Sequence, residues 1–433
     1  MMLRILGALG ALLLISGSGI PAWAAPAPVS SLCDELLQKA PDLRDYAAVF
    51  TPEFRADVPL EKLKSTFGGL YAVVGKCVSY QLIPISGREH RLILTGESGI
   101  AALLRIYIRP ESGLLSGLYT AGVDDPAIRI GSWNDLPQAF HRLDPDGTFA
   151  ATLVTGDHRL IFEQAASQPL SIASTFKLYI LGALQTAIAA GQHSWNEILP
   201  IHEEWKSFPS GVMHEWTAGK EVTLSEYAEK MISISDNTAA DHLLYFLGRE
   251  RVEEMLTPMG NQHAFLDLPL FSTLELFKLK WAISPSETDR FIQSDQTERR
   301  AILESLTQVP RSAVGTNGVP FELPSHVNQL GWFATTSENC EAMFWLAAQE
   351  SSEIRKALSI SAPFGGDSGH WTYRGYKGGS DSGVLSMTYL LESVSGTRAC
   401  LSMTWNNSIH AVSSPRFQDV MRKTIKLAEI LIP

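Results

Sequence analysis

The stretch STFKLYILGALQTAIAA, residues 174–190, decides how this chain is interpreted. Ser174 and Lys177 lie three residues apart, just ahead of an apolar run that predicts a buried helix. Residues at this spacing share one face of a helix, so the hydroxyl and the amine are expected side by side. A Ser at a helix start is most often only a cap, and this spacing alone is a weak motif. The meaning of the pair therefore depends on the rest of the chain.

Two further short motifs follow the pair along the chain. The triplet SDN at 235–237 is expected in a loop, and the quartet KGGS at 377–380 is expected at the start of a strand. In this order and in these contexts, the three motifs resemble those of the penicillin-recognising serine acyltransferases, and of class A β-lactamases in particular. Each motif alone could be a cap, a turn or a solvated end, but three ordered matches make coincidence a poor explanation.

The resemblance extends beyond these motifs and covers about residues 145 to 430. The stretch PSGVMHEWTAGKEVTLSEYAEKMISISDNTAAD, residues 209–241, is similar to the segment that class A enzymes carry up to their second motif. With a small domain ahead of this part, the plan of the chain is similar to that of the two-domain β-lactamase-like proteins encoded in clavulanic-acid gene clusters.

The resemblance implies a catalytic role for three residues. Ser174 would be the nucleophile, with backbone N–H groups at the helix start helping to hold a developing oxyanion. Lys177 would activate it, because an amine is a base when burial and a nearby cation keep it neutral. Ser235 would relay a proton to the leaving nitrogen.

The resemblance also implies a set of substrate-binding residues. Asn237 would hydrogen-bond a substrate amide, and Lys377 would supply the cation that tunes Lys177. Gly379 would allow close backbone approach. The N–H near Ser380 would complete the oxyanion pocket, while the Ser380 hydroxyl would contact a substrate carboxylate.

The sequence departs from the class A pattern at two places. Gly378 replaces the usual Ser or Thr, and Ser380 or Ser382 is expected to offset the lost hydroxyl. The Glu that positions the deacylating water has no clear counterpart. Glu275, 38 residues past Asn237, is the nearest carboxylate, but its surroundings predict a structural role in a helix capped by Ser272.

Length and pattern together predict an α+β protein of two domains, because 433 residues exceed one ordinary core. A small α+β accessory domain is expected at 31–125, with helices followed by a meander of strands, and it faintly resembles cystatin-like and steroid-isomerase-like folds. The serine hydrolase domain is expected at 126–433, after a linker at about 123–137. In it, strands at both ends surround a helical middle, which predicts an antiparallel sheet with an inserted helical lobe.

The elements expected from the patterns are helices within 31–75, strands at 78–83, 90–95, 100–108 and 114–122, a hairpin at 149–155 and 158–164, helices from 174 to about 350, strands at 383–392 and 398–407, and a final helix with Phe417, Val420, Met421, Leu427 and Leu431 on one apolar side.

The first 24 residues have the layout of a cleaved secretory signal. Arg4 precedes an apolar stretch, and Ala22 and Ala24 favour cleavage after Ala24. Leu32 ahead of Cys33 argues against a lipid anchor. We therefore expect a periplasmic or secreted protein with no membrane segment after cleavage.

The four cysteines fit an oxidising compartment. Pairing within each half, Cys33 with Cys77 and Cys340 with Cys400, is the simplest of three connectivities, with free buried thiols as the alternative. No CxxC or His-rich spacing predicts a metal site, and no cofactor motif is present.

Charge and motifs together narrow the class of partner. A formal net charge of −11 without clustered Lys and Arg argues against nucleic acid, so a small-molecule substrate is expected. The predicted function is a serine hydrolase of the class A β-lactamase type, acylated on Ser174 by a β-lactam or a related ester and deacylated slowly. The alternatives are a carboxylesterase or D,D-peptidase with the same site, or a penicillin-binding sensor without turnover.

Overall fold

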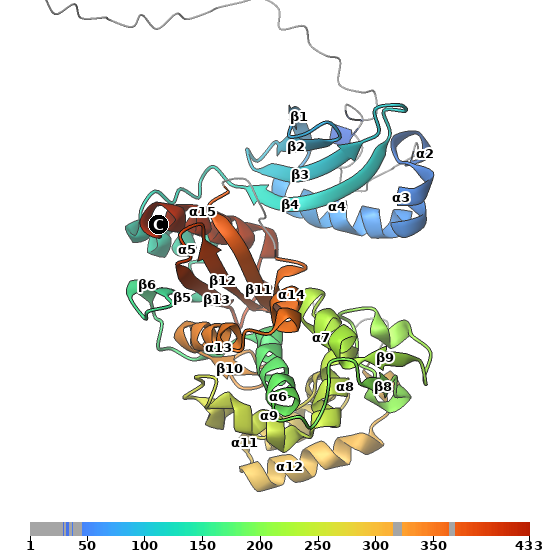
Figure 1. The fold of residues 1–433 in the computed structure, drawn as a ribbon, viewed down its shortest axis with the longest axis vertical. Coiled ribbons are helices and arrows are strands. Elements are labelled where there is room, and N and C mark those ends of the chain that lie inside the picture. Colours follow the sequence, from blue (N-terminus) through green and yellow to red (C-terminus); the bar gives the residue numbers. More distant parts are fainter. Residues whose placement is uncertain (1–28, 30–31, 34–36, 38–45, 315–322, 363–368) are drawn as a thin grey trace, which may run out of the picture. The chain divides into compact units, whose positions relative to one another are not determined.

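The structure is a computed structural model that describes residues 29, 32–33, 37, 46–314, 323–362 and 369–433 (Figure 1). The expected signal at 1–24 lies outside the described residues. The chain divides into two compact units, residues 1–120 and 121–433. Each unit is described by itself.

The first unit contains helices followed by a sheet whose four strands neighbour one another in chain order, as the strand pattern predicted. Its longest helix buries Leu63, Phe67, Leu70 and Val74, which recur at helical spacing. The finer likeness to cystatin-like folds stays a prediction. The elements are α2 (Tyr46–Val49), α3 (Pro52–Asp57), α4 (Leu60–Val74), β1 (Cys77–Pro84), β2 (Glu89–Gly96), β3 (Ala101–Ile108) and β4 (Leu115–Asp124).

Each unit holds one disulfide bond. Cys33 pairs with Cys77, and Cys340 pairs with Cys400, which confirms the predicted connectivity. The second bond links a helix of the lobe to a central strand of the larger sheet.

The second unit is built on a five-stranded antiparallel sheet in the order β11-β12-β13-β5-β6. Strands from both ends of the unit meet in it, so the predicted sheet with an inserted helical lobe is confirmed. Its strands are β5 (Thr148–Thr155), β6 (Leu160–Gln164), β11 (Trp371–Asp381), β12 (Val384–Ser393) and β13 (Arg398–Asn406).

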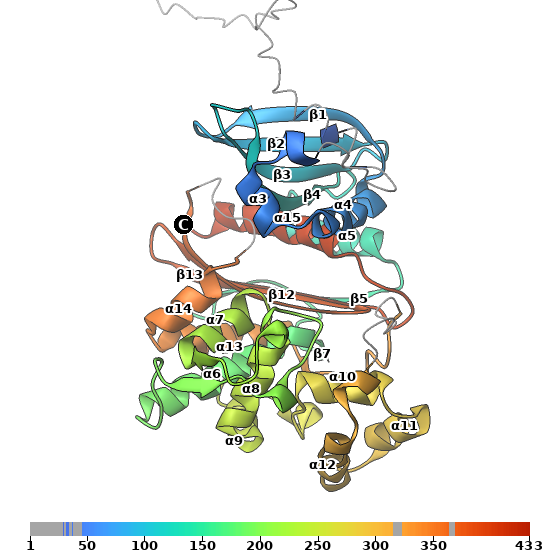
Figure 2. The same cartoon turned by 90° about the vertical axis from the view of Figure 1, so that its right-hand side faces the viewer.

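Helices cover both faces of this sheet (Figure 2). On one face, α5 (Leu136–Leu143) and α15 (Ser414–Leu431) bury an apolar layer against the strands. In α15, Phe417, Val420, Met421 and Leu427 are buried as predicted, but Leu431 is 46% exposed because the helix ends there.

The helical lobe covers the other face. The predicted run of helices from 174 to about 350 is interrupted by short strands, which the apolar pattern did not reveal. The elements are β7 (Leu170–Ser171), α6 (Lys177–Ala189), β8 (Ile198–Pro200), β9 (Glu221–Thr223), α7 (Leu224–Ser233), α8 (Asn237–Leu247), α9 (Arg249–Leu256), α10 (Thr273–Trp281), α11 (Pro285–Gln293), α12 (Gln296–Ser305), β10 (Phe333–Ala334), α13 (Thr336–Ala348) and α14 (Ser352–Ser359).

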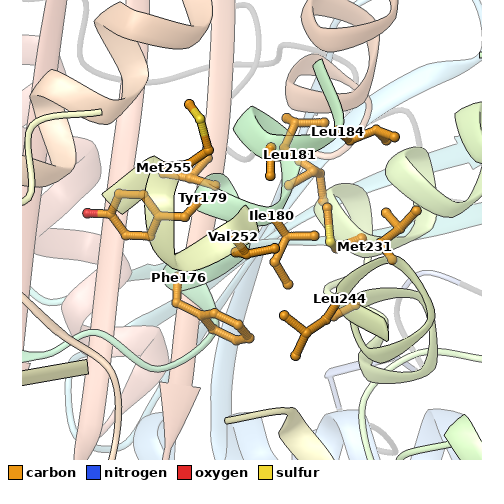
Figure 3. Close-up of a cluster of buried hydrophobic side chains, with 14 of the residues drawn as sticks. Phe176, Tyr179, Ile180, Leu181, Leu184, Met231, Leu244, Val252 and Met255 are labelled. Carbon is orange, nitrogen blue, oxygen red and sulfur yellow. The ribbon is translucent and has the colours of Figure 1, made fainter. Parts of the chain in front are cut away.

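Helix α6 lies in the middle of the lobe and is buried on nearly all sides, as its apolar run predicted. Figure 3 shows Ile180, Leu181 and Leu184 of this helix among side chains from α7, α8 and α9, including Met231 and Leu244. Because this core surrounds α6, the residues at its start are held in a fixed position.

Candidate active site

Ser174 lies in a short 3-10 turn, Ala173–Phe176, that leads directly into α6. Ala173, just before it, has a φ of +43°, and Ser235 has a φ of +57°. Residues other than glycine rarely adopt this left-handed region, and such strain is concentrated at functional sites. One strained position, Ser235, therefore belongs to the predicted site, and another, Ala173, directly precedes the predicted nucleophile.

The two lysines converge on Ser235, although 200 residues separate them along the chain (377 minus 177). Lys177 Nζ lies 3.3 Å from Ser235 Oγ, and Lys377 Nζ lies 3.0 Å from the same oxygen. Lys177 Nζ also donates to the Ser235 carbonyl and to Asn237 Oδ1, each at 2.6 Å. The three predicted motifs thus meet in one place.

Both amines are buried, and burial is the main cause of their perturbed pKa values. It lowers the pKa of Lys177 to about 7, although the carboxylates of Asp236 and Asp241 act in the opposite direction. Burial and then repulsion from Lys177 lower the pKa of Lys377. For Lys177, desolvation rather than the predicted influence of Lys377 is the dominant cause.

A cavity of about 710 Å³ opens beside this cluster. Seven of the eight predicted site residues line this cavity. The eighth, Lys177, does not line it but contacts Ser235, which does. The seven are Ser174, Ser235, Asn237, Lys377, Gly379, Ser380 and Ser382.

Strand β11 is an edge strand of the sheet and forms one wall of the cavity. The prediction that Lys377 lies at the start of a strand is wrong, because β11 begins at Trp371 and places Lys377 in its second half. The glycines at 375, 378 and 379 weaken the strand pattern, so its start was placed too late along the chain.

Gly379 is required where β11 passes the start of α6. A Cβ atom added there would lie 2.1 Å from the Ile172 carbonyl oxygen and 2.7 Å from the Ser174 nitrogen. The strand backbone therefore lies against the backbone of Ser174, as the expected close approach requires.

Gly378 has a different explanation. A Cβ atom added at this position would lie 2.0 Å from the Tyr376 hydroxyl oxygen, so the tyrosine hydroxyl takes the space of a side chain at 378. Tyr376 also lines the cavity. Because side chains alternate along a strand, residues 376 and 378 share a face of β11, and the sequence could have indicated that Tyr376 lies beside position 378.

Helix α10 forms another part of the wall, with Thr273, Leu276 and Phe277. Glu275 does not line this cavity. Its carboxylate accepts from the backbone N–H of Ser272 in a capping box and pairs with Arg249 at 2.8 Å. The predicted structural role of Glu275 is therefore confirmed, and α10 offers the cavity one hydroxyl and two apolar side chains.

The described residues contain no group of three or more His, Cys, Asp or Glu side chains arranged to hold a metal ion. In the same part of the chain, no helix has the length and hydropathy of a membrane span.

Comparison with known proteins adds family evidence to this geometry. Residues 143–299 match the model of the beta-lactamase enzyme family. No curated protein matches the chain. The matched residues lie within the second unit and include the first two motifs, so the match agrees with the resemblance drawn from them, and the family indicates a hydrolase.

Solved structures similar to the chain include a beta-lactamase from Sphaerobacter thermophilus, with 20% identity, a TM-score of 0.48, and coverage of 70% of this chain and 99% of that one. A beta-lactamase from Desulfarculus baarsii is 16% identical, with a TM-score of 0.47, over 68% of this chain and 98% of that one. A variant of PBP-A, described as an acyl-enzyme complex with penicillin G, is 17% identical, with a TM-score of 0.45, over 70% and 98% of the two chains.

Proposed function

We propose that the protein is a serine hydrolase that forms an acyl-enzyme on Ser174 with a β-lactam or a related ester or amide. The observation that carries this proposal is the convergence of Lys177 and Lys377 on Ser235 Oγ, beside the cavity that Ser174 lines. A lysine with a pKa of about 7 is neutral often enough at neutral pH to act as a base.

In the proposed reaction, the Ser174 hydroxyl attacks the substrate carbonyl and its proton passes to the neutral amine of Lys177. Ser235, which both lysines contact, returns a proton to the leaving group. Backbone N–H groups of Ser174 and Ser380 hold the oxyanion, and Asn237 binds a substrate amide.

Deacylation is proposed to be slow. Helix α10 lines the cavity with Thr273, Leu276 and Phe277. Among the described residues of α10, none brings a carboxylate to the cavity that could position a deacylating water. Loss of a general base costs about 10² to 10⁴ in rate, or roughly 3 to 5 kcal/mol on the barrier. Slow deacylation also favours a second candidate, a penicillin-binding sensor that stays acylated. A carboxylesterase or D,D-peptidase is a further alternative, because acyl-enzymes formed from esters are easier to hydrolyse.

We also propose export to the periplasm or the medium for the hydrolase domain at 126–433 and the accessory domain at 31–125. The two disulfide bonds support an oxidising compartment.

A chromogenic cephalosporin tests the function. A hydrolase should give a stoichiometric burst followed by a slow steady rate, whereas a sensor should give the burst alone. Intact mass should show one adduct on the native protein and none on Ser174→Ala. Absence of any Ser174-dependent adduct with β-lactams and activated esters alike would refute the proposal.

A further inference from the structure

A buried carboxylate lies directly behind the part of the cavity wall that α10 forms. Asp241, in α8, is 1% exposed, and its oxygens accept three hydrogen bonds from the start of α10. The backbone N–H groups of Thr273 and Leu274 donate at 2.8 Å and 3.0 Å, and the Thr273 hydroxyl donates to Oδ1 at 2.9 Å. Because Ser272 already caps this helix through its contact with Glu275, the contact of the hydroxyl is additional to helix capping.

The Thr273 hydroxyl connects this carboxylate to the reactive groups. Thr273 lines the cavity together with Ser174 and Asn237. Its Oγ1 lies 3.5 Å from the Asn237 carbonyl oxygen, and the side chain of Asn237 accepts from Lys177 Nζ at 2.6 Å. The carboxylate of Asp241 also acts on the pKa of Lys177, so these two groups lie close together. The hydroxyl is therefore within hydrogen-bond distance of the carboxylate and is linked through Asn237 to the base that serves acylation.

The two groups have the properties that a proton relay needs. A hydroxyl that donates to a carboxylate can still accept a hydrogen bond from a water molecule. Ser207 Oγ, 2.8 Å from Thr273 Oγ1, is a second acceptor for the same hydroxyl proton. Burial raises the pKa of Asp241 to about 7, although the hydrogen bonds from α10 act in the opposite direction. A carboxylate with this pKa holds a transferred proton better than an ordinary one, and about half of it is still ionised at neutral pH.

We infer that Thr273 and Asp241 form the proton relay that deacylates Ser174, with the Thr273 hydroxyl holding the attacking water. This inference rests on the proposed function, because it takes Ser174 as the acylated residue. The water oxygen attacks the acyl carbon while one of its protons passes to Thr273 Oγ1 and the hydroxyl proton of Thr273 passes to Asp241 Oδ1. As the bond between the acyl carbon and Ser174 Oγ breaks, the proton returns through Thr273 to that oxygen. The products are the free acid and the serine hydroxyl. The relay accounts for deacylation without a carboxylate at the cavity wall.

The lifetime of the acyl-enzyme tests the relay separately from acylation. The protein is acylated with benzylpenicillin, the free compound is removed, and loss of the adduct is followed by intact mass. Thr273→Val keeps the shape of the side chain and the backbone contact with Asp241 but removes the hydroxyl. It should lengthen the lifetime of the adduct at least about tenfold, while the rate of acylation changes less than about threefold. Thr273→Ser, which retains a hydroxyl, should restore most of the native rate of deacylation.

A second variant tests the carboxylate. Asp241→Asn keeps an oxygen for the N–H of Thr273 but cannot take up the proton, so it should lengthen the lifetime about as much as Thr273→Val. The double variant should be no slower than either single variant, because the groups of one relay act as a unit. Effects that add up, with acylation slowed equally, would show a structural role and overturn the inference. So would a Thr273→Val adduct as short-lived as the native one, or a native adduct that does not decay. Absence of any Ser174-dependent adduct would instead refute the proposed function, and the inference with it.

Discussion

The pKa of Lys177 leads to a specific dependence of acylation on pH. Burial lowers this pKa from 10.5 to about 7, and only the neutral amine accepts the proton of Ser174. About half of the molecules carry the neutral amine at pH 7, and about 1% carry it at pH 5. The acylation rate should therefore rise about a hundredfold from pH 5 and level off above about pH 8.

Stopped-flow measurement of the burst with a chromogenic cephalosporin, between pH 5 and pH 10, gives this profile directly. Lys177→Met, which keeps the length of the side chain and removes the amine, should lower the rate by about 10² to 10⁴ at the plateau. A lysine of ordinary pKa would make the rate climb tenfold per pH unit up to about pH 10. Such a climb, or a rate that is flat between pH 5 and pH 7, would refute the assignment of Lys177 as the base.

Two further substitutions test the geometry. Gly379→Ala places a Cβ atom 2.1 Å from the Ile172 carbonyl and 2.7 Å from the Ser174 nitrogen, backbone atoms that cannot rotate away. Acylation should fall about a hundredfold or more with the fold retained by circular dichroism, and a rate like that of the native protein would contradict the close approach. Replacing both Cys340 and Cys400 by Ser removes the disulfide that closes a loop of 60 residues. The free energy of unfolding in urea should fall by about 4 kcal/mol, and a fall of less than about 1 kcal/mol would contradict this prediction.

Much of the site could be predicted because its chemistry is concentrated in short motifs. The hydroxyl at 174, the amine at 177 and the serine at 235 need only local spacing and order to be recognised, and the structure brings them together with Lys377. Apolar runs bounded by turn residues likewise predicted the four strands of the first sheet and β5, β6, β12 and β13 of the second.

The remaining features depend on contacts between distant segments. Helix α5 at 136–143 was not predicted, because its apolar side chains follow a polar stretch typical of a linker. The start of strand β11 was placed too late, at Lys377 rather than Trp371, because its glycines weaken the strand pattern. The role of Tyr376 follows from a contact with Gly378 that only the folded strand reveals.

The contact between Tyr376 and Gly378 means that the residues tolerated at these two positions depend on each other. A serine or threonine at 378 would collide with the tyrosine hydroxyl, whose ring is packed 4.7 Å from that of Tyr389. The two positions are therefore coupled, because a side chain at 378 needs the Tyr376 ring to move or to be replaced by a smaller residue. We expect a double substitution that also reduces residue 376 to restore a hydroxyl at 378 at less cost in stability than Gly378→Ser alone.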